Sequence, residues 1–396
     1  MKIFASMCAF LFTGGFVVSD TDYFVLRRGL GNSKQVFEST GMGRVVFLGG
    51  SITFMSGWRD MVCAELERRF PETKFDFINA GIPSTGSTPG AYRLARDVLK
   101  NGPVDLMFEE AAVNDFYNGR SDKEQIRGME GIVRHAQNIN PNIDIILMHF
   151  VDPEKVKEYN NGEVPAVIKN HERVAVHYNL PSINFALEVT ERINREEFSW
   201  ENDFKDLHPS PFGHQLYFRT ISRLFEFAWV GKSTGENSRI KAYYQPDKLD
   251  EFCYDTGVLL SPDNVEKVNG FIMDPKWENT VGGATRPGFV NVPMLVGKNP
   301  GDSFELSFVG SAVGLFVIAG PDSGRVEYRV DNGKWQKQDL YTKWSRGLHI
   351  PWVYMLEAEL EKEKKHRLEV RLLDQKNRQS QGYSCRIVNF VINAYE

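Results

Sequence analysis

Four short motifs contain the residue types that acyl transfer requires. They are GGSIT with Ser51, NAG with Gly81, AVND with Asn114 and DLHP with His208. A serine becomes a nucleophile at neutral pH when a neighbouring base takes its proton, and a backbone N–H together with a carboxamide can hold the negative charge that develops on the carbonyl oxygen. Each residue also has an ordinary structural role, Ser51 as a helix cap and the others in turns or loops. The motifs therefore predict a serine hydrolase if the fold brings them together.

The strands and helices predicted between residues 44 and 228 are expected to bring the four motifs together. Short apolar runs alternate with helical patterns, which predicts a parallel sheet covered by helices on both faces. The first three motifs each follow a predicted strand, and His208 precedes the last helix. Ligands bind outside the carboxyl ends of such strands. The predicted strands are Arg44–Leu48, Phe75–Asn79, Val104–Phe108, Ile143–Met148 and Ser182–Phe185, and the predicted helices are 58–70, Pro89–Leu99, Lys123–Asn138, Val164–Tyr178 and 211–228.

In order and content, the four motifs resemble the blocks of the SGNH/GDSL hydrolases, over roughly residues 44–228. The resemblance implies a flavodoxin-like three-layer α/β/α sandwich with a parallel sheet, and ester hydrolysis through an acyl-enzyme without a cofactor or metal ion. It implies Ser51 as the nucleophile and His208 as the base. The oxyanion hole would consist of the backbone N–H groups of Ser51 and Gly81 and the Asn114 side chain. Gly50 replaces the aspartate usual before the serine, and this GGSIT form resembles carbohydrate O-acetylesterases.

The residue that orients the histidine is left open by the sequence. An acid stands two residues before His208, at Asp206, whereas the family's usual spacing is three, and that position holds Lys205. Asp206 is favoured, and Asp203 or a backbone carbonyl are the alternatives. His214, in the first turn of the last helix, is a rival to His208 as the base, although a capping or pocket-lining role suits it better.

The chain changes character near residue 230. The segment 231–239 is polar and small, as a linker would be, and beyond it strands with period-two alternation replace the helical patterns, for example Ser303–Phe308 and Arg325–Val330. Residues 20–230 are therefore expected to form the catalytic domain, and residues 240–396 a jelly-roll-like all-β sandwich, a candidate carbohydrate-binding domain. The charged run Glu357–Lys365 is expected to be a solvated edge or hairpin tip.

Composition and the first residues indicate an exported enzyme. Residues 1–19 combine a basic start with an apolar run and are predicted to be a cleaved signal peptide, so the protein is expected to be secreted or periplasmic. No later run is long enough to span a membrane. The net charge of −5 gives no electrostatic footprint for nucleic acid, and the eight histidines show no metal-ligand spacing. Cys253 and Cys385 could form one disulfide in an exported domain.

The substrate is predicted less directly. Trp58, Arg59 and Asp115 are expected near the bound ester, and the tryptophans of the second domain either stack on sugar rings or fill its core. A secreted esterase with an appended β domain favours removal of O-acetyl groups from a polysaccharide or oligosaccharide. The alternatives are a lipase or lysophospholipase, and a non-catalytic glycan-binding protein with a relic site. The sequence does not indicate an oligomeric state.

Overall fold

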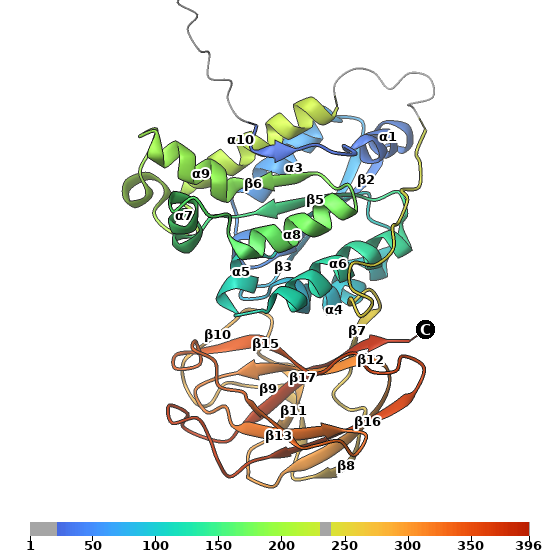
Figure 1. Cartoon of the computed structure of the whole chain (residues 1–396), viewed down its shortest axis with the longest axis vertical. Coiled ribbons are helices and arrows are strands. Elements are labelled where there is room, and N and C mark those ends of the chain that lie inside the picture. Colours follow the sequence, from blue (N-terminus) through green and yellow to red (C-terminus); the bar gives the residue numbers. More distant parts are fainter. Residues whose placement is uncertain (1–21, 230–238, 396) are drawn as a thin grey trace, which may run out of the picture.

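Two domains lie end to end in the computed structural model, which describes residues 22–229 and 239–395 (Figure 1). The α/β domain carries all four motifs, and the all-β domain follows it. The predicted signal peptide lies outside the described residues, as does the predicted linker except for Arg239. No helix in the described ranges is both long and apolar enough to cross a membrane.

The described part of the α/β domain is built on a six-stranded sheet with the order β1-β6-β5-β4-β2-β3. The five predicted strands are parallel to one another, as expected. The sixth strand, β1, was not predicted; it has two residues and pairs antiparallel with β6 at the edge of the sheet. The strands are β1 Phe24–Val25, β2 Met42–Gly49, β3 Lys74–Gly81, β4 Leu106–Glu110, β5 Asp144–His149 and β6 Ser182–Asn184.

Helices cover both faces of this sheet, because the strands bury apolar side chains on both sides. Along β2, Val46 and Leu48 pack into the core shared with α4, α6 and α8, whereas Val45 and Phe47 pack into the core shared with α1, α3, α9 and α10. This is the three-layer arrangement that the resemblance implied. The helices are α1 Gly31–Thr40, α2 Ser51–Phe54, α3 Trp58–Arg69, α4 Ser87–Asp97, α5 Ala112–Tyr117, α6 Asp122–Ile139, α7 Pro153–Asn160, α8 Ala166–His177, α9 Phe185–Asn194 and α10 Pro211–Ala228, with the short 3-10 helix η1 Leu99–Asn101 and π-helix η2 Trp200–Phe204.

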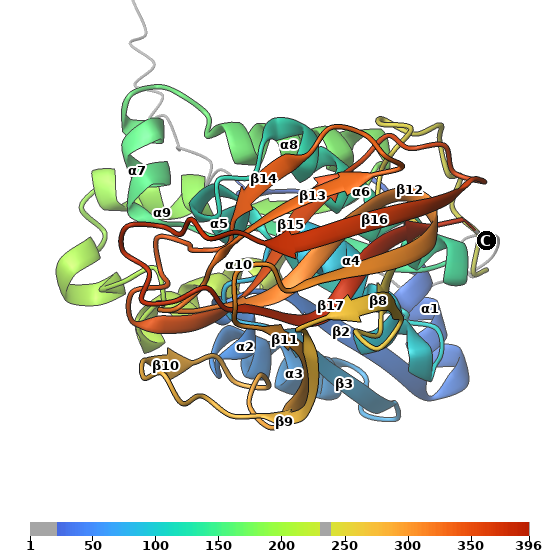
Figure 2. The ribbon, with the colours of Figure 1, turned by 90° about the horizontal axis from the view of Figure 1, so that it is seen from below.

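The second domain is all-β and mainly antiparallel, as predicted (Figure 2). Its 17-residue strand β12 belongs to two layers. The first half of β12 pairs with β8 and β16, and the second half, after an irregularity at Gly310, pairs with β15 and β17. Side chains from both halves, such as Phe304 and Leu315, share one core. The strands are β7 Gly257–Leu260, β8 Val265–Asn269, β9 Ile272–Trp277, β10 Ala284–Thr285, β11 Val292–Gly297, β12 Ser303–Ala319, β13 Arg325–Val330, β14 Gln336–Asp339, β15 Leu348–Glu357, β16 Lys365–Leu372 and β17 Cys385–Ala394.

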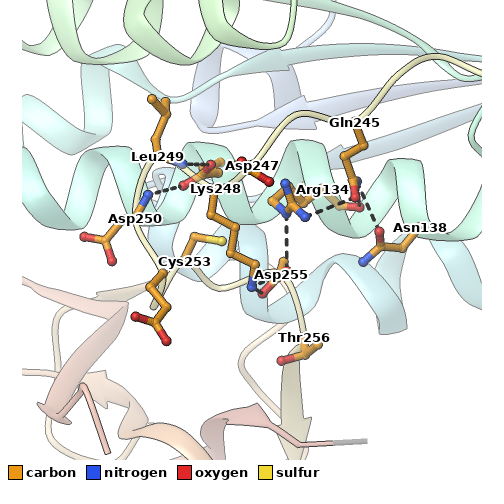
Figure 3. Close-up of polar contacts among 12 residues, drawn as sticks. Arg134, Asn138, Gln245, Asp247, Lys248, Leu249, Asp250, Cys253, Asp255 and Thr256 are labelled. Atoms are coloured by element: carbon orange, nitrogen blue, oxygen red, sulfur yellow. Dashed lines mark hydrogen bonds and ion pairs between the residues drawn. The ribbon is translucent and has the colours of Figure 1, made fainter.

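The segment that enters the β domain is bound to the catalytic domain along α6. Arg134 donates to the carbonyl oxygen of Pro246 (2.7 Å) and to Gln245 Oε1 (3.1 Å), and it lies 3.4 Å from Asp255 (Figure 3). Lys248 pairs with the same Asp255 carboxylate at 2.7 Å. Residues 243–255 therefore lie against the α/β domain, although the sequence analysis placed the beginning of the β domain at residue 240.

Apolar packing makes the two domains continuous. The core on the α4–α6 side of the sheet extends through Tyr92 and Tyr254, whose ring centroids are 4.9 Å apart, to Phe316 and Val391 of the β domain. The charged run 357–365 joins β15 to β16 and is solvated, as expected, and it also contacts the catalytic domain. Glu359 accepts from Lys123 at 3.0 Å and from Arg127 at 2.6 Å, both on α6.

The three cysteines of the described residues are all free. Cys253 and Cys385 are buried separately, so the disulfide that the sequence left open does not form. Burial raises the pKa of the Cys385 thiol to about 12, so it stays protonated and behaves as a small apolar group.

Gly131 on α6 is expected to be required for contact between the domains. A Cβ atom there would come within 2.7 Å of the Tyr254 backbone. Gly131→Ala should therefore lower the Tm, although alanine gains roughly 1 kcal/mol over glycine in a helix interior. Gly90→Ala on α4 is the matched control, since its Cβ meets only the flexible end of Ile132, at 3.1 Å. Thermal unfolding that ranks the two variants in the opposite order would contradict the proposed close packing.

Candidate active site

The turn that presents Ser51 has no room for side chains. Strand β2 ends at Gly49, and Ser51 is the first residue of α2. A Cβ atom on Gly49 would overlap Thr53 Oγ1, and one on Gly50 would overlap Asn114 Oδ1. The glycine that replaces the family's aspartate therefore lets the Asn114 carboxamide lie directly against the turn of the predicted nucleophile.

Ser51 and His208 lie in hydrogen-bonding contact. Ser51 Oγ is 2.7 Å from His208 Nε2, although 157 positions separate the two residues in the chain. His208 is held in the loop before α10, where Ser210 caps the helix by accepting from the Gly213 N–H. The His208 side chain is 46% exposed, so solvent and substrate can reach the pair.

Asp206 is the carboxylate beside the histidine. Its Oδ1 lies 3.6 Å from His208 Nδ1 and accepts from the His208 backbone N–H at 3.0 Å. The alternative, Asp203, faces the beginning of η2, where it accepts from the backbone N–H of Ser199 at 2.8 Å and from its hydroxyl at 3.2 Å. The geometry therefore favours Asp206 over Asp203 as the group that orients the imidazole.

Gly81 lies at the site, but its N–H group already has a partner. A Cβ atom on Gly81 would overlap the backbone nitrogen of Phe54, so the end of β3 contacts α2 directly. The Gly81 N–H donates to Asn79 Oδ1 at 3.0 Å, and Asn79 Nδ2 donates to the Phe54 carbonyl oxygen at 3.0 Å. Its predicted role as an oxyanion donor would require this bond to Asn79 to open.

The Asp115 side chain points into the interior, so it cannot bind substrate directly as the sequence predicted. Its side chain is fully buried and accepts from the Ser87 N–H at 2.9 Å, from the Ser87 hydroxyl at 2.5 Å, and from His171 Nε2 at 3.1 Å. A carboxylate suits the first turn of a helix, and Ser87 begins α4. Asp115 therefore joins α4 and α8 to α5, the helix that carries Asn114. Sequence reasoning missed Ser87 and His171, since their partner is 28 and 56 positions away.

Trp58 also lies in the core and cannot contact substrate, because burial is complete. Its ring packs against Phe47 and Phe150, and its Nε1 donates to the Ile52 carbonyl oxygen at 3.1 Å. Arg59 donates to the Thr53 carbonyl oxygen at 3.3 Å and pairs with Asp60 at 3.0 Å. Trp58 therefore supports α2 from the core. Arg59 contacts the end of α2 and stays partly exposed, so its role in substrate binding stays a prediction.

His214 can be set aside as the base. Its ring packs against Gly57, where a Cβ atom would come within 2.5 Å, and Nδ1 accepts from the Trp58 N–H at 3.3 Å. Burial lowers the pKa of His214, which favours the neutral ring needed to accept that bond.

A buried carboxyl group supports the beginning of α5. Glu110 Oε1, at the end of β4, accepts from the Val113 N–H at 3.1 Å. Burial raises the pKa of Glu110 to about 7, and the nearby Lys155 ammonium opposes that shift.

In the described residues, no group of three or more His, Cys, Asp or Glu side chains could hold a metal ion.

Residues 47–216 match the family model described as GDSL-like Lipase/Acylhydrolase. The α/β domain is thus a domain of the GDSL-like acylhydrolase family, and the chain is a carboxylic ester hydrolase. No curated protein sequence shows a significant match to the chain.

Both domains resemble those of a solved esterase. The structure of a two-domain esterase (CEX) active on acetylated mannans aligns with a TM-score of 0.75 and 23% identity, over 94% of this chain and 97% of that one. Its complex with mannopentaose gives a TM-score of 0.72 and 22% identity, over 93% of this chain and 97% of that one. The likeness shows a shared two-domain fold. Axe2, an acetylxylan esterase from Geobacillus stearothermophilus, aligns with 48% of this chain and 96% of its own, with a TM-score of 0.39 and 18% identity.

Asp206→Ala is expected to lower kcat for an acetyl ester by roughly 10- to 100-fold. The cost should be smaller than the ~10⁴-fold loss on removing a buried triad acid, because Asp206 is largely exposed. Asp203→Ala is the matched control and should keep kcat within roughly threefold, since its contacts are with Ser199. Equal activity of the two variants would exclude a carboxylate as the group that orients His208.

Ser87→Ala is expected to lower both stability and kcat, because it removes a donor from the buried Asp115 and loosens the support of Asn114. The stability cost should be about 1–3 kcal/mol. Thr88→Val is the control on the same helix, since the Thr88 hydroxyl is buried without a partner and its loss should be neutral or stabilising. Denaturant unfolding and acetyl-ester kinetics test the pair. Unchanged kcat in a destabilised Ser87→Ala protein would limit the network to a folding role.

Proposed function

We propose that this ester hydrolase is an exported carbohydrate O-acetylesterase that acts through a Ser-His-Asp acyl-enzyme. The observation that carries the proposal is the 2.7 Å contact between Ser51 Oγ and His208 Nε2, at the carboxyl ends of the strands. This pair supplies an activated nucleophile without a cofactor.

In the proposed mechanism, His208 takes the proton of Ser51 as Oγ attacks the acetyl carbonyl carbon. The Ser51 backbone N–H and the Asn114 side chain stabilise the resulting oxyanion, together with a backbone N–H of the loop after β3. As the bond between the acyl carbon and the sugar oxygen breaks, His208 protonates that oxygen, and the sugar leaves as an alcohol. His208 then activates water, which releases acetate from Ser51, while Asp206 stabilises the imidazolium.

A carbohydrate substrate is supported by the grooves between the two domains. One groove of about 450 Å³ is lined by Tyr117 and Asn118 of the catalytic domain and by Asp339, Tyr341 and Trp352 of the β domain. Aromatic faces beside polar groups suit sugar rings, which present apolar faces and hydroxyl edges. The CEX esterase is described as active on acetylated mannans, so an acetylated mannan is the first polysaccharide to assay.

The lipase alternative has weaker support. A large apolar groove of about 670 Å³ lies at the β1–β6 edge, lined among others by Phe24, Val25 and Ile168. None of its lining residues lies on α5, the helix that carries Asn114, whereas Tyr117 of α5 lines the groove between the domains. A second groove, of about 530 Å³, lies between the two domains and includes Gly81. Its lining is mainly apolar, with polar side chains such as Arg96 and Asn389 at its wall.

Ser51→Ala is expected to abolish ester hydrolysis in a folded protein, with a loss in kcat of at least about 10⁴-fold. Ser56→Ala, two residues beyond α2 at an exposed position, is the control and should retain full activity. Ester turnover in Ser51→Ala close to that of the wild type would refute the proposed nucleophile. A wild-type protein inactive on every ester would instead favour a non-catalytic glycan-binding protein with a relic site.

An acyl-chain series on the wild type separates the two substrate classes. The O-acetylesterase should show its highest kcat/KM with acetyl esters and a steep fall by butyryl, with acetate released from acetylated mannan. A lipase groove instead gains about 0.8 kcal/mol for each buried CH₂. A kcat/KM that rises steadily from acetyl to octanoyl would therefore replace the proposal with the lipase alternative.

A further inference from the structure

A loop of the β domain reaches the active-site end of the catalytic domain. Strand β10 pairs with the beginning of β15, and the next residue, Arg286, donates its backbone N–H to the His349 carbonyl oxygen at 3.1 Å. His349 is fully buried and packs against Trp277, with ring centroids 5.5 Å apart and ring planes tilted by 52°. The backbone of Arg286 is therefore fixed by a packed part of the β domain, and the preceding strand β10 lies on the side of that domain that faces the catalytic domain (Figure 1).

The side chain of Arg286 crosses to the loop after β3. Its Nε donates to Ser84 Oγ at 3.1 Å. Burial lowers the pKa of Arg286, and no carboxylate of the described residues forms an ion pair with it. Burying part of an arginine side chain without a counter-ion costs folding free energy. A role in domain association alone therefore does not explain why Arg286 lies at this boundary.

Ser84 has an unusual backbone. Its φ of 74° lies in the left-handed region, which costs a residue with a Cβ atom about 1 kcal/mol or more and persists only where the surroundings enforce it. Two bonds do so here. Asn118 Nδ2 donates to the Ser84 carbonyl oxygen at 3.0 Å, and Arg286 holds the hydroxyl. Such enforced conformations cluster at functional sites.

The Ser84 loop also borders the predicted nucleophile. The Thr85 carbonyl oxygen lies 3.4 Å from the position that a Cβ atom of Gly50 would take. The Gly81 N–H is occupied by Asn79, whereas the Ser84 N–H has no hydrogen-bond partner within the described ranges. The loop thus offers an unused backbone donor one residue from a contact with the turn that presents Ser51.

We infer that Arg286 is a positioning residue for ester hydrolysis. Its bond to Ser84 Oγ holds the left-handed backbone that directs the Ser84 N–H to the oxyanion, alongside the Ser51 N–H and the Asn114 side chain. The β domain thereby completes the oxyanion hole. The inference rests on the proposed acyl-enzyme mechanism and adds to it a requirement for the second domain.

The test uses p-nitrophenyl acetate, which carries no sugar for the β domain to bind. Arg286→Ala in the full chain should lower kcat about tenfold or more with KM within about twofold, since a small displacement at a reacting centre can cost ~10²-fold. Arg286→Lys should recover part of the loss, because an ammonium can donate to the same hydroxyl. In the Ser84→Gly background Arg286→Ala should cost less than about twofold, because glycine adopts the left-handed conformation unaided.

Glu359→Ala is the matched control, since it breaks another contact between the domains, the pair with Lys123 and Arg127. It should lower the Tm but not kcat. Three results would overturn the inference and leave the proposed function intact. The first is a full kcat in Arg286→Ala, and the second is an equal loss of kcat in Glu359→Ala. The third is an effect of Arg286→Ala that is just as large in the Ser84→Gly background. A wild type inactive on the acetyl ester would instead overturn the proposed function, and this inference with it.

Discussion

The close approach of three strand ends is the constraint on which the site depends. The turn after β2 contacts α5, and the end of β3 contacts α2, at distances that exclude any side chain on Gly50 or Gly81. Only backbone can occupy these places, so the predicted nucleophile, the Asn114 carboxamide and the loop after β3 lie close together. A side chain at either position would separate them, and a displacement of about 1 Å at a reacting centre is costly.

Electrostatic support for this edge comes from beneath. Asp115 accepts three hydrogen bonds without access to solvent, and Glu110 accepts a backbone N–H of α5 while burial raises its pKa. Buried carboxyl groups are tolerated when their oxygens are satisfied. Polar contacts of Asp115 and of the Val113 N–H therefore fix α5 from the inside, and the Asn114 side chain remains available to the active site.

The sequence predicted the parallel strands, the last helix and the domain order, because apolar periodicity and the Ser210-Pro211 cap are local signals. It also placed Ser51 and His208 together, since strand ends in an α/β sheet share one edge. It failed where the decisive partner is remote in the chain. In the sequence, Trp58 and Asp115 resemble pocket residues because they follow Ser51 and Asn114. In the structure, Trp58 packs in the core and Asp115 accepts hydrogen bonds from Ser87. The contact of Arg286 with Ser84 spans 202 positions, and no local pattern encodes it.

The apolar core that runs from Tyr92 through Tyr254 into the β domain has a consequence for biosynthesis. The ribosome completes the α/β domain before the strands that cover its α4–α6 face exist. During that interval the nascent domain exposes an apolar surface, and such surfaces aggregate or recruit chaperones. Strand β17 supplies Val391 to this core, so the covering is finished only after β17 has been synthesised. Export of the chain in an unfolded state would avoid the problem, because both halves would then meet at the same time.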